Sequence, residues 1–116
     1  MKKLIIEGGR PLAGTIRTAG AKNAVLPMMA AGLLSHGTLK LRGAPRLVDV
    51  RFMTRVLRDL GAQAEQAQNG DMEINASGDI KGEASWDLVR RMRGSLCVMG
   101  PMLARLGRAR VSMPGG

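Results

Sequence analysis

The sequence predicts an α/β (α+β) fold in which short strands alternate with helices, some of them apolar on nearly every side. Residues 38–42 alternate polar and apolar side chains, a pattern typical of a half-buried strand. Residues 49–60 place apolar side chains at helical spacing along one face. Residues 23–34 and 86–106 are rich in Ala, Leu and Met all round, so these helices need cover from more than one layer.

The chain starts with two expected strands, residues 3–7 and 12–18, separated by Gly and Pro residues that favour a turn. A small-residue turn then leads into the first helix. In this turn Gly20 can adopt a positive φ, and its missing side chain lets another backbone or a ligand approach closely. Pro27 lies near the start of the helix, where a missing N–H is tolerated. Gly37 is expected to end this segment in left-handed geometry.

A strand and an amphipathic helix are expected next. Leu39 and Leu41 face inward from the strand. Asp49 can cap the helix, which Gly61 ends. The expected inward face of this helix comprises Val50, Met53, Val56, Leu57 and Leu60, and the arginines of the opposite face, which we expect in solvent, are Arg51, Arg55 and Arg58.

The next expected element is a hairpin. Its strands are residues 63–67 and 72–74, and Asn69-Gly70 between them is the pair that favours a hairpin turn. Residues 78–84 follow as a polar connection.

The last third of the chain is the apolar segment 86–106 and a final strand. We expect a helix entry and then a buried helix with a break near Pro101. Residues 108–113 alternate as a strand. The expected order of elements is therefore ββ-α-β-α-ββ-α-β.

Composition and charge limit the functions that the chain can have. Among 116 residues, 18 are Lys or Arg and nine are Asp or Glu, and the net charge of +9 favours anionic partners. Phe52 and Trp86 are too few aromatic residues for a groove that binds single-stranded nucleic acid. A single cysteine, Cys97, and a single histidine exclude an internal disulfide and a zinc finger. The single cysteine fits a reducing compartment. No segment approaches the roughly 20 apolar residues of a membrane span, and the apolar run near the start is too short for a signal peptide. We therefore expect a cytoplasmic location.

Lys22 and Asn23 are the candidate binding residues. A lysine and an amide at a helix start face an anion together with free backbone N–H groups and the positive end of the helix dipole. The pattern indicates a seat for a phosphate or a carboxylate. The alternative, a solvated lysine in an ordinary strand-to-helix turn, stays open on these residues alone.

Several segments lie, in order, on one family template. They are GAKNA at 20–24, AAGLLSHGT at 30–38, LGA at 60–62, DLVRRMRGS at 87–95, MGP at 99–101, LAR at 103–105 and SMPGG at 112–116. Together they closely resemble the N-terminal part of the UDP-N-acetylglucosamine 1-carboxyvinyltransferases, which make the first committed precursor of peptidoglycan. The resemblance covers the whole chain and roughly the first quarter to third of the family's length.

The resemblance implies both a fold and an activity. The family fold is two inside-out α/β barrels of repeated βαβαββ units with helices buried inside, incomplete in this chain. Residues 1–21 then correspond to first strands that pack with the C-terminal domain, and residues 22–116 to the first unit and the start of the second. The activity is transfer of the enolpyruvyl group of phosphoenolpyruvate to the 3′-hydroxyl of UDP-N-acetylglucosamine, with release of phosphate.

The resemblance also implies site residues. Lys22 and Asn23 match the family's pair at phosphoenolpyruvate, where an ammonium also stabilises charge as phosphate departs. Arg93 matches the arginine that contacts UDP-N-acetylglucosamine, although on the residues alone Arg90 and Arg91 are equal candidates. No cofactor and no metal are implied, and the partners are the two substrates and the remainder of the same enzyme, with no nucleic acid and no membrane.

In the family, the Pro-Gly-Gly run precedes a catalytic cysteine or aspartate, which acts as general acid; the cysteine is alkylated by fosfomycin. This chain ends at Gly116, one residue before that position, and Cys97 is not its equivalent. We therefore expect the 116-residue chain alone to be inactive as a transferase, because closure of two domains around the substrates is needed.

Two other functions compete with this one. The shikimate-pathway enolpyruvyl transferase shares the fold and the donor, but there a serine typically follows the lysine, where this chain has Asn23. A basic nucleic-acid-binding module is the non-enzymatic alternative. It predicts clustered arginines, whereas here they are spread from Arg10 to Arg110.

Overall fold

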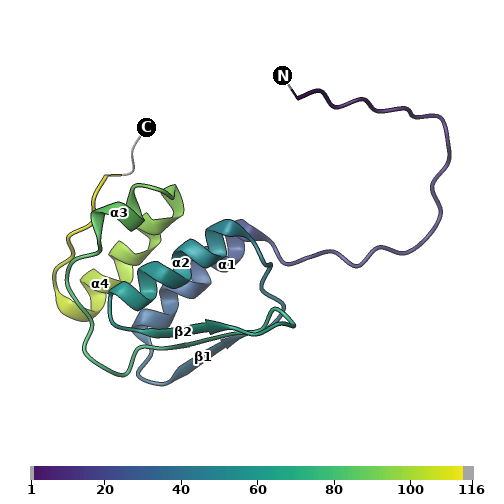
Figure 1. Cartoon of the computed structure of the whole chain (residues 1–116). Helices are drawn as coiled ribbons and strands as arrows, with labels where there is room; N and C mark the ends of the chain where they lie inside the picture. The colour runs from purple at the N-terminus through teal and green to yellow at the C-terminus, as the bar shows by residue number, and fades with distance from the viewer. Residues whose placement is uncertain (1, 114–116) are drawn as a thin grey trace.

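The computed structural model describes residues 2–113, and in Figure 1 helices lie over one face of a small sheet while the N-terminal segment stands away from both. Along the chain the elements are α1 (Lys22–Ala31), η1 (Gly32–Leu34), β1 (Thr38–Leu41), α2 (Val48–Asp59), β2 (Gln63–Gln66), β3 (Met72–Asn75), α3 (Trp86–Val89), η2 (Arg93–Val98) and α4 (Met99–Leu106). The mixture of strands and helices confirms the predicted α+β class.

The sheet has the strand order β1-β3-β2, and both pairings are antiparallel. One row across the strands consists of Leu39, Ile74 and Ala64, which pack into the core beneath the helices. The other face is polar and exposed. It carries Lys40 and Glu73, whose Nζ and Oε1 atoms lie 2.8 Å apart. The alternation read from the sequence therefore gives the correct inward side of the sheet.

The predicted hairpin is confirmed as β2 and β3. The connection closes through the N–H of Ala67, which donates to the carbonyl of Asp71 at 2.8 Å. Gly70 has a φ of 93°, a conformation that only glycine adopts without strain. The side chain of Asn69 accepts the N–H of Asp71 at 3.0 Å, which fixes the turn locally.

Helix α2 buries the face that its periodicity predicts: its five expected core residues are all at most 1% exposed. The expected cap is wrong. Leu47 occupies the N-cap without a side-chain hydrogen bond, and Asp49 lies in the first turn instead. The Asp49 carboxylate pairs with Lys22 and makes no hydrogen bond to the helix backbone.

Helix α1 is covered on one side only by the residues that the structure describes. Its buried side chains are Val25, Leu26, Met29 and Ala30. The opposite side exposes Ala24, Pro27, Met28 and Ala31. The expectation that Gly37 ends this segment in left-handed geometry is wrong, because its φ is not positive. The Ser35 hydroxyl accepts the Gly37 N–H at 3.1 Å and closes the turn instead.

The apolar segment after residue 85 breaks earlier than expected. Pro101 is the third residue of α4, where the first turn leaves N–H groups unused, so it causes no break. The chain bends instead at residues 90–92, between α3 and η2. The buried Ser95 hydroxyl stabilises this bend, because its single O–H lies within hydrogen-bond reach of the carbonyls of Val89 (3.0 Å) and Met92 (2.6 Å).

Both strands expected at the start of the chain are wrong for this structure, since residues 2–21 form no strand. Their apolar side chains, which drew the prediction, find no cover among the described residues: Leu4, Ile5 and Ile6 are 85%, 82% and 79% exposed. The final strand shrinks to a bridge between Glu83 and Arg110, a parallel pairing. A strand pattern needs a partner strand: the described part of the chain supplies none for residues 2–21, and only residues 82–84 for the last segment.

Gly32 and Gly100 form a matched pair for a stability prediction. A Cβ on Gly32 would lie 2.7 Å from Cγ2 of buried Ile74, whereas one on Gly100 would meet nothing within 4 Å. We expect Gly32→Ala to lower the free energy of unfolding by about 1–3 kcal/mol through overpacking. Gly100→Ala is expected to raise it by about 0.5–1 kcal/mol, because alanine is the better helix former. Urea unfolding of both variants checks the opposite signs, and two changes of the same sign would contradict this packing.

Arg105 joins three segments that are distant in sequence. Its Nη1 donates to the carbonyl of Leu33 at 2.8 Å, and its Nη2 donates to the carbonyl of Gly78 at 3.0 Å. Hydrogen bonds from a charged group contribute about 1.5–3 kcal/mol each before solvent exposure is considered. We expect Arg105→Ala to destabilise the chain by about 2 kcal/mol. Arg105→Lys should recover less than half of the loss, because an ammonium lacks the planar fork; full recovery in urea unfolding would contradict the bridging role.

Candidate functional site

Lys22 and Asn23 are the first two residues of α1, at the end where the N-terminal segment joins the helix. The Nζ of Lys22 lies 2.8 Å from Oδ2 of Asp49, in the first turn of α2. The amino ends of the two helices are therefore neighbours. Both side chains stay partly open to solvent, at 46% for Lys22 and 33% for Asp49.

The amino end of α1 is the uncompensated one of the two. Helix α2 has Asp49 in its first turn, whereas α1 has no acidic residue in its first turn and no side-chain cap. The N–H groups of Ala24 and Val25 donate to the carbonyl of Ala21. Within residues 2–113, those of Lys22 and Asn23 donate to none. Free N–H groups, the dipole end and an ammonium converge there, which is the chemistry that attracts an anion.

Gly20 serves the site through close packing. Gly20 does not use the positive φ that is open to a glycine, because it is not among the residues with that conformation. The expectation of a close backbone approach is confirmed: a Cβ would lie 2.7 Å from the carbonyl oxygen of Gly43 and 3.2 Å from Cδ of Pro45. The turn before α1 therefore rests against the loop that leads into α2.

Arg93 is the first residue of η2 and is exposed. Its neighbour Gly94 packs so closely on α1 that a Cβ would lie 2.9 Å from Cδ1 of Leu26. Leu26 is one helical turn beyond Lys22, so η2 begins beside the amino-terminal half of α1. The structure thus places Lys22 and Asn23 on one helix end and Arg93 on the segment that packs against that helix.

The three arginines that sequence alone left equal differ in their contacts. The Arg90 guanidinium lies over the Trp86 ring, 4.2 Å from its centroid, and Nε of Arg91 donates to the carbonyl of Asp87 at 3.2 Å. For Arg93, no hydrogen bond or ion pair occurs with any residue between 2 and 113. Arg93 is therefore the member of this run whose guanidinium has no partner among residues 2–113.

Sequence reasoning missed Asp49 as a member of the site. An aspartate at the start of an amphipathic helix is normally read as a cap. Its pairing with a lysine 27 positions earlier depends on how α1 and α2 pack, and no local pattern reports that.

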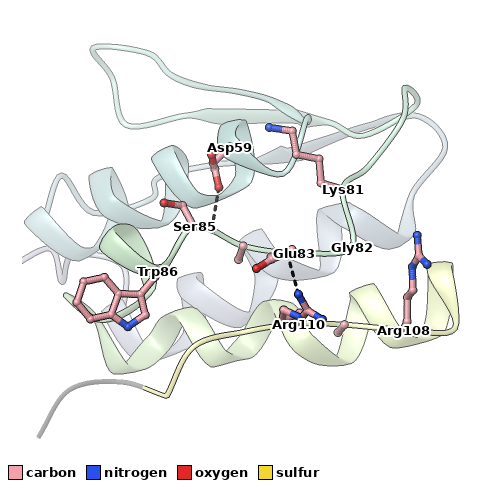
Figure 2. Close-up of a pocket in the computed structure, with 10 residues that line it drawn as sticks. Asp59, Lys81, Gly82, Glu83, Ser85, Trp86, Arg108 and Arg110 are labelled. Atoms are coloured by element: carbon pink, nitrogen blue, oxygen red, sulfur yellow. Dashed lines mark hydrogen bonds and ion pairs between the residues drawn. The ribbon is translucent and has the colours of Figure 1, made fainter.

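A groove also lies elsewhere on the chain. It measures about 760 Å³ and runs between residues 81–86 and 108–110, with Asp59 at one side (Figure 2). Oδ2 of Asp59 accepts the N–H of Ser85 at 2.9 Å, and Arg110 faces Glu83 at 3.5 Å. None of the predicted site residues lines it. Glu83 and Arg110 form an ion pair within it, whereas Lys81 and Arg108 form none with residues 2–113. Its size alone does not make it the binding site.

Residues 2–113 contain neither a candidate metal site nor a candidate membrane span. No group of three or more His, Cys, Asp or Glu side chains is placed to hold a metal ion. No helix in that range is long and apolar enough to cross a membrane.

The sequence and the fold of this chain are those of a carboxyvinyltransferase family. A family model described as EPSP synthase (3-phosphoshikimate 1-carboxyvinyltransferase) matches residues 6–116, and the chain belongs to this family. Within the family it is similar to UDP-N-acetylglucosamine 1-carboxyvinyltransferases along its whole length. The sequence identity is 50% with UDP-N-acetylglucosamine 1-carboxyvinyltransferase 1 of Halalkalibacterium halodurans, 49% with the transferase of Desulforapulum autotrophicum and 48% with that of Myxococcus xanthus.

A solved structure agrees with these sequence relatives. The enolpyruvyl transferase NikO from Streptomyces tendae matches with a TM-score of 0.78 and 29% identity over 91% of this chain. The chain spans only 26–28% of the length of the sequence relatives named above and 25% of that solved chain. It therefore corresponds to about a quarter of a complete enzyme of this kind.

Proposed function

We propose that this chain forms one wall of the active site of an enzyme that transfers the enolpyruvyl group of phosphoenolpyruvate to the 3′-hydroxyl of UDP-N-acetylglucosamine, releasing phosphate. The observation that carries the proposal is the similarity of 45–50% identity over the whole chain to enzymes named for this reaction. The reaction belongs to peptidoglycan precursor synthesis, and we assign the protein to the cytoplasm.

In this proposal Lys22 and Asn23 hold phosphoenolpyruvate at the amino end of α1. The Lys22 ammonium bonds the phosphate or carboxylate and stabilises the charge that develops as phosphate leaves. The amide of Asn23 can donate to and accept from a substrate hydroxyl. Arg93 takes UDP-N-acetylglucosamine, since a guanidinium fork suits the diphosphate or uracil oxygens. No cofactor takes part.

The complete enzyme is proposed to have the inside-out barrel architecture, with this chain as part of one domain. Two features support this. The exposed apolar side of α1, including Met28 at 52%, needs cover by further helices. Residues 2–21 carry exposed apolar side chains at strand spacing and stand away from the body, as expected if residues 1–21 pair as strands with a second domain.

Steady-state measurement of phosphate release tests the proposed function. The polypeptide that the gene encodes, at its whole length, is supplied with phosphoenolpyruvate and UDP-N-acetylglucosamine, and in parallel with phosphoenolpyruvate and shikimate 3-phosphate. We expect release with the first pair only. Release with shikimate 3-phosphate alone would favour the other activity in this family. Residues 1–116 by themselves are expected to release none, because the opposite wall of the site is needed.

A basic nucleic-acid-binding role receives little support. Several arginines that such a role requires already donate hydrogen bonds to backbone carbonyls of this chain, among them Arg58, whose Nε donates to the carbonyl of Ala64 at 2.7 Å. Binding of DNA and RNA at two salt concentrations checks this: a steep loss of tight binding with salt would revive that role.

A further inference from the structure

The ion pair between Lys22 and Asp49 is not explained by the roles proposed so far. We propose that Asp49 is a positioning residue for Lys22: its carboxylate holds the ammonium at the amino end of α1 and offsets part of its charge, so that an anion is bound in one orientation and can leave again. This inference rests on the proposed function. It assigns to Asp49 a role that acts through Lys22.

Stability does not account for the pair. The side chains of Lys22 and Asp49 are 46% and 33% exposed, and pairs of this kind contribute little to folding. The sheet carries a second pair with the same 2.8 Å separation, Lys40 and Glu73, at 69% and 58% exposure. That pair lies on the polar face of the sheet, on β1 and β3, and provides a matched comparison.

The carboxylate of Asp49 is carried on a rigid support. The residue is followed by the fully buried Val50, which fixes the first turn of α2 against the core. Hydrogen bonds hold the loop before α2 against the hairpin: Nε2 of Gln66 donates to the carbonyl of Ala44 at 3.0 Å. Nη1 of Arg46 likewise donates to the carbonyl of Gln68 at 3.0 Å. The positive end of the α2 dipole favours a carboxylate at this place.

Lys22, in contrast, has four rotatable bonds, and its ammonium needs an external hold to stay in one place. An ammonium has three donors. With one donated to Asp49, two remain for an incoming phosphate or carboxylate above the free N–H groups of α1. The negative charge of Asp49 also repels the anion that is bound on the other side of the ammonium. This repulsion weakens binding of the anion in the ground state and favours departure of phosphate.

These two effects have opposite consequences for binding and turnover. In Asp49→Asn the repulsion is lost, so the affinity for inorganic phosphate and for phosphoenolpyruvate is expected to rise about threefold. This is the effect of removing the repulsion between two like charges about 5–6 Å apart in a largely aqueous setting. Turnover is expected to fall about tenfold, because the ammonium is no longer held in the productive geometry. Asp49→Glu keeps the charge and is expected to restore the wild-type affinity. A merely structural role would lower affinity and turnover together.

The test measures two quantities on the polypeptide at its whole length: the dissociation constant of inorganic phosphate and phosphoenolpyruvate by calorimetry, and kcat and KM by phosphate release. Glu73→Gln is the control, and we expect it to match the wild type in both. Tighter anion binding with slower turnover in Asp49→Asn supports the proposal. Equality of Asp49→Asn with Glu73→Gln, or weaker binding in Asp49→Asn, overturns it. If the wild type releases no phosphate, the proposed function fails, and the difference in anion affinity alone decides the role of Asp49.

Discussion

Lys22→Met is expected to lower the turnover of phosphoenolpyruvate and UDP-N-acetylglucosamine by at least about 100-fold, the usual cost of removing one preplaced group that stabilises developing charge. Methionine keeps the length of the side chain and its packing while it removes the ammonium. The free energy of unfolding should change by less than about 1 kcal/mol, because the pair with Asp49 is partly exposed. Phosphate release at saturating substrates is the measurement.

Lys40→Met is the control for this variant. Lys40 makes an ion pair of the same length, 2.8 Å, but on the polar face of the sheet. It removes the same charge from the chain, so it reports any effect of net charge alone. We expect it to retain wild-type turnover. Equal losses in the two variants would show that general electrostatics, and not the place of Lys22, governs the rate.

Leu57→Ala is expected to have the largest effect on stability. Leu57 is fully buried on the inward face of α2. Its truncation removes apolar burial and leaves a cavity, at a cost of about 2–5 kcal/mol. A chain of this size has only about 5–15 kcal/mol in total, so a large part of the folded population is at risk. The shift of the urea unfolding midpoint, followed by circular dichroism, measures it.

Leu103→Ala gives the comparison for this prediction. Leu103 lies on α4 and is 47% exposed, so its truncation should cost less than about 1 kcal/mol. In the complete enzyme the stability cost of Leu103→Ala can be larger if another unit covers this side of α4. A loss at Leu103 as large as that at Leu57 in the 116-residue chain would contradict the core described above.

Local patterns were sufficient for the elements whose partners lie nearby in the chain. The alternation at residues 38–42 gives the inward side of β1, and the spacing from Val50 to Leu60 gives the buried face of α2. The hairpin follows from Asn69-Gly70, because the turn requires a residue that tolerates a positive φ. In each case the signal and the structure depend on the same few residues.

Elements that need a distant partner were predicted less well. Residues 3–7 and 12–18 have strand patterns, but no strand pairs with them between residues 2 and 113.

Pro101 was expected to break a helix, yet its position in the first turn of α4 makes it harmless. The actual bend depends on hydrogen bonds of the buried Ser95 hydroxyl, which no sequence pattern announces.

The candidate site was predictable in part. Lys22 and Asn23 follow from the residue types at a helix start, whereas the choice of Arg93 among its neighbours came from the family resemblance. The structure adds a physical distinction, since Arg90 and Arg91 have partners within the fold. Asp49 could not be assigned, because its role depends on the packing of two helices. The roles of Lys22, Asn23 and Arg93 toward substrate stay predictions.

The most direct test of the central claim is a titration of the isotope-labelled protein with phosphoenolpyruvate, followed by the backbone amide signals in NMR spectra. We expect the largest shifts at the amino end of α1, at Lys22 and Asn23, since the free N–H groups there would bond the anion. The signals of Glu83 and Arg110 should stay unchanged, although these residues line the groove between residues 81–86 and 108–110. Shifts confined to that groove, or no shifts at α1, would contradict an anion site built on Lys22.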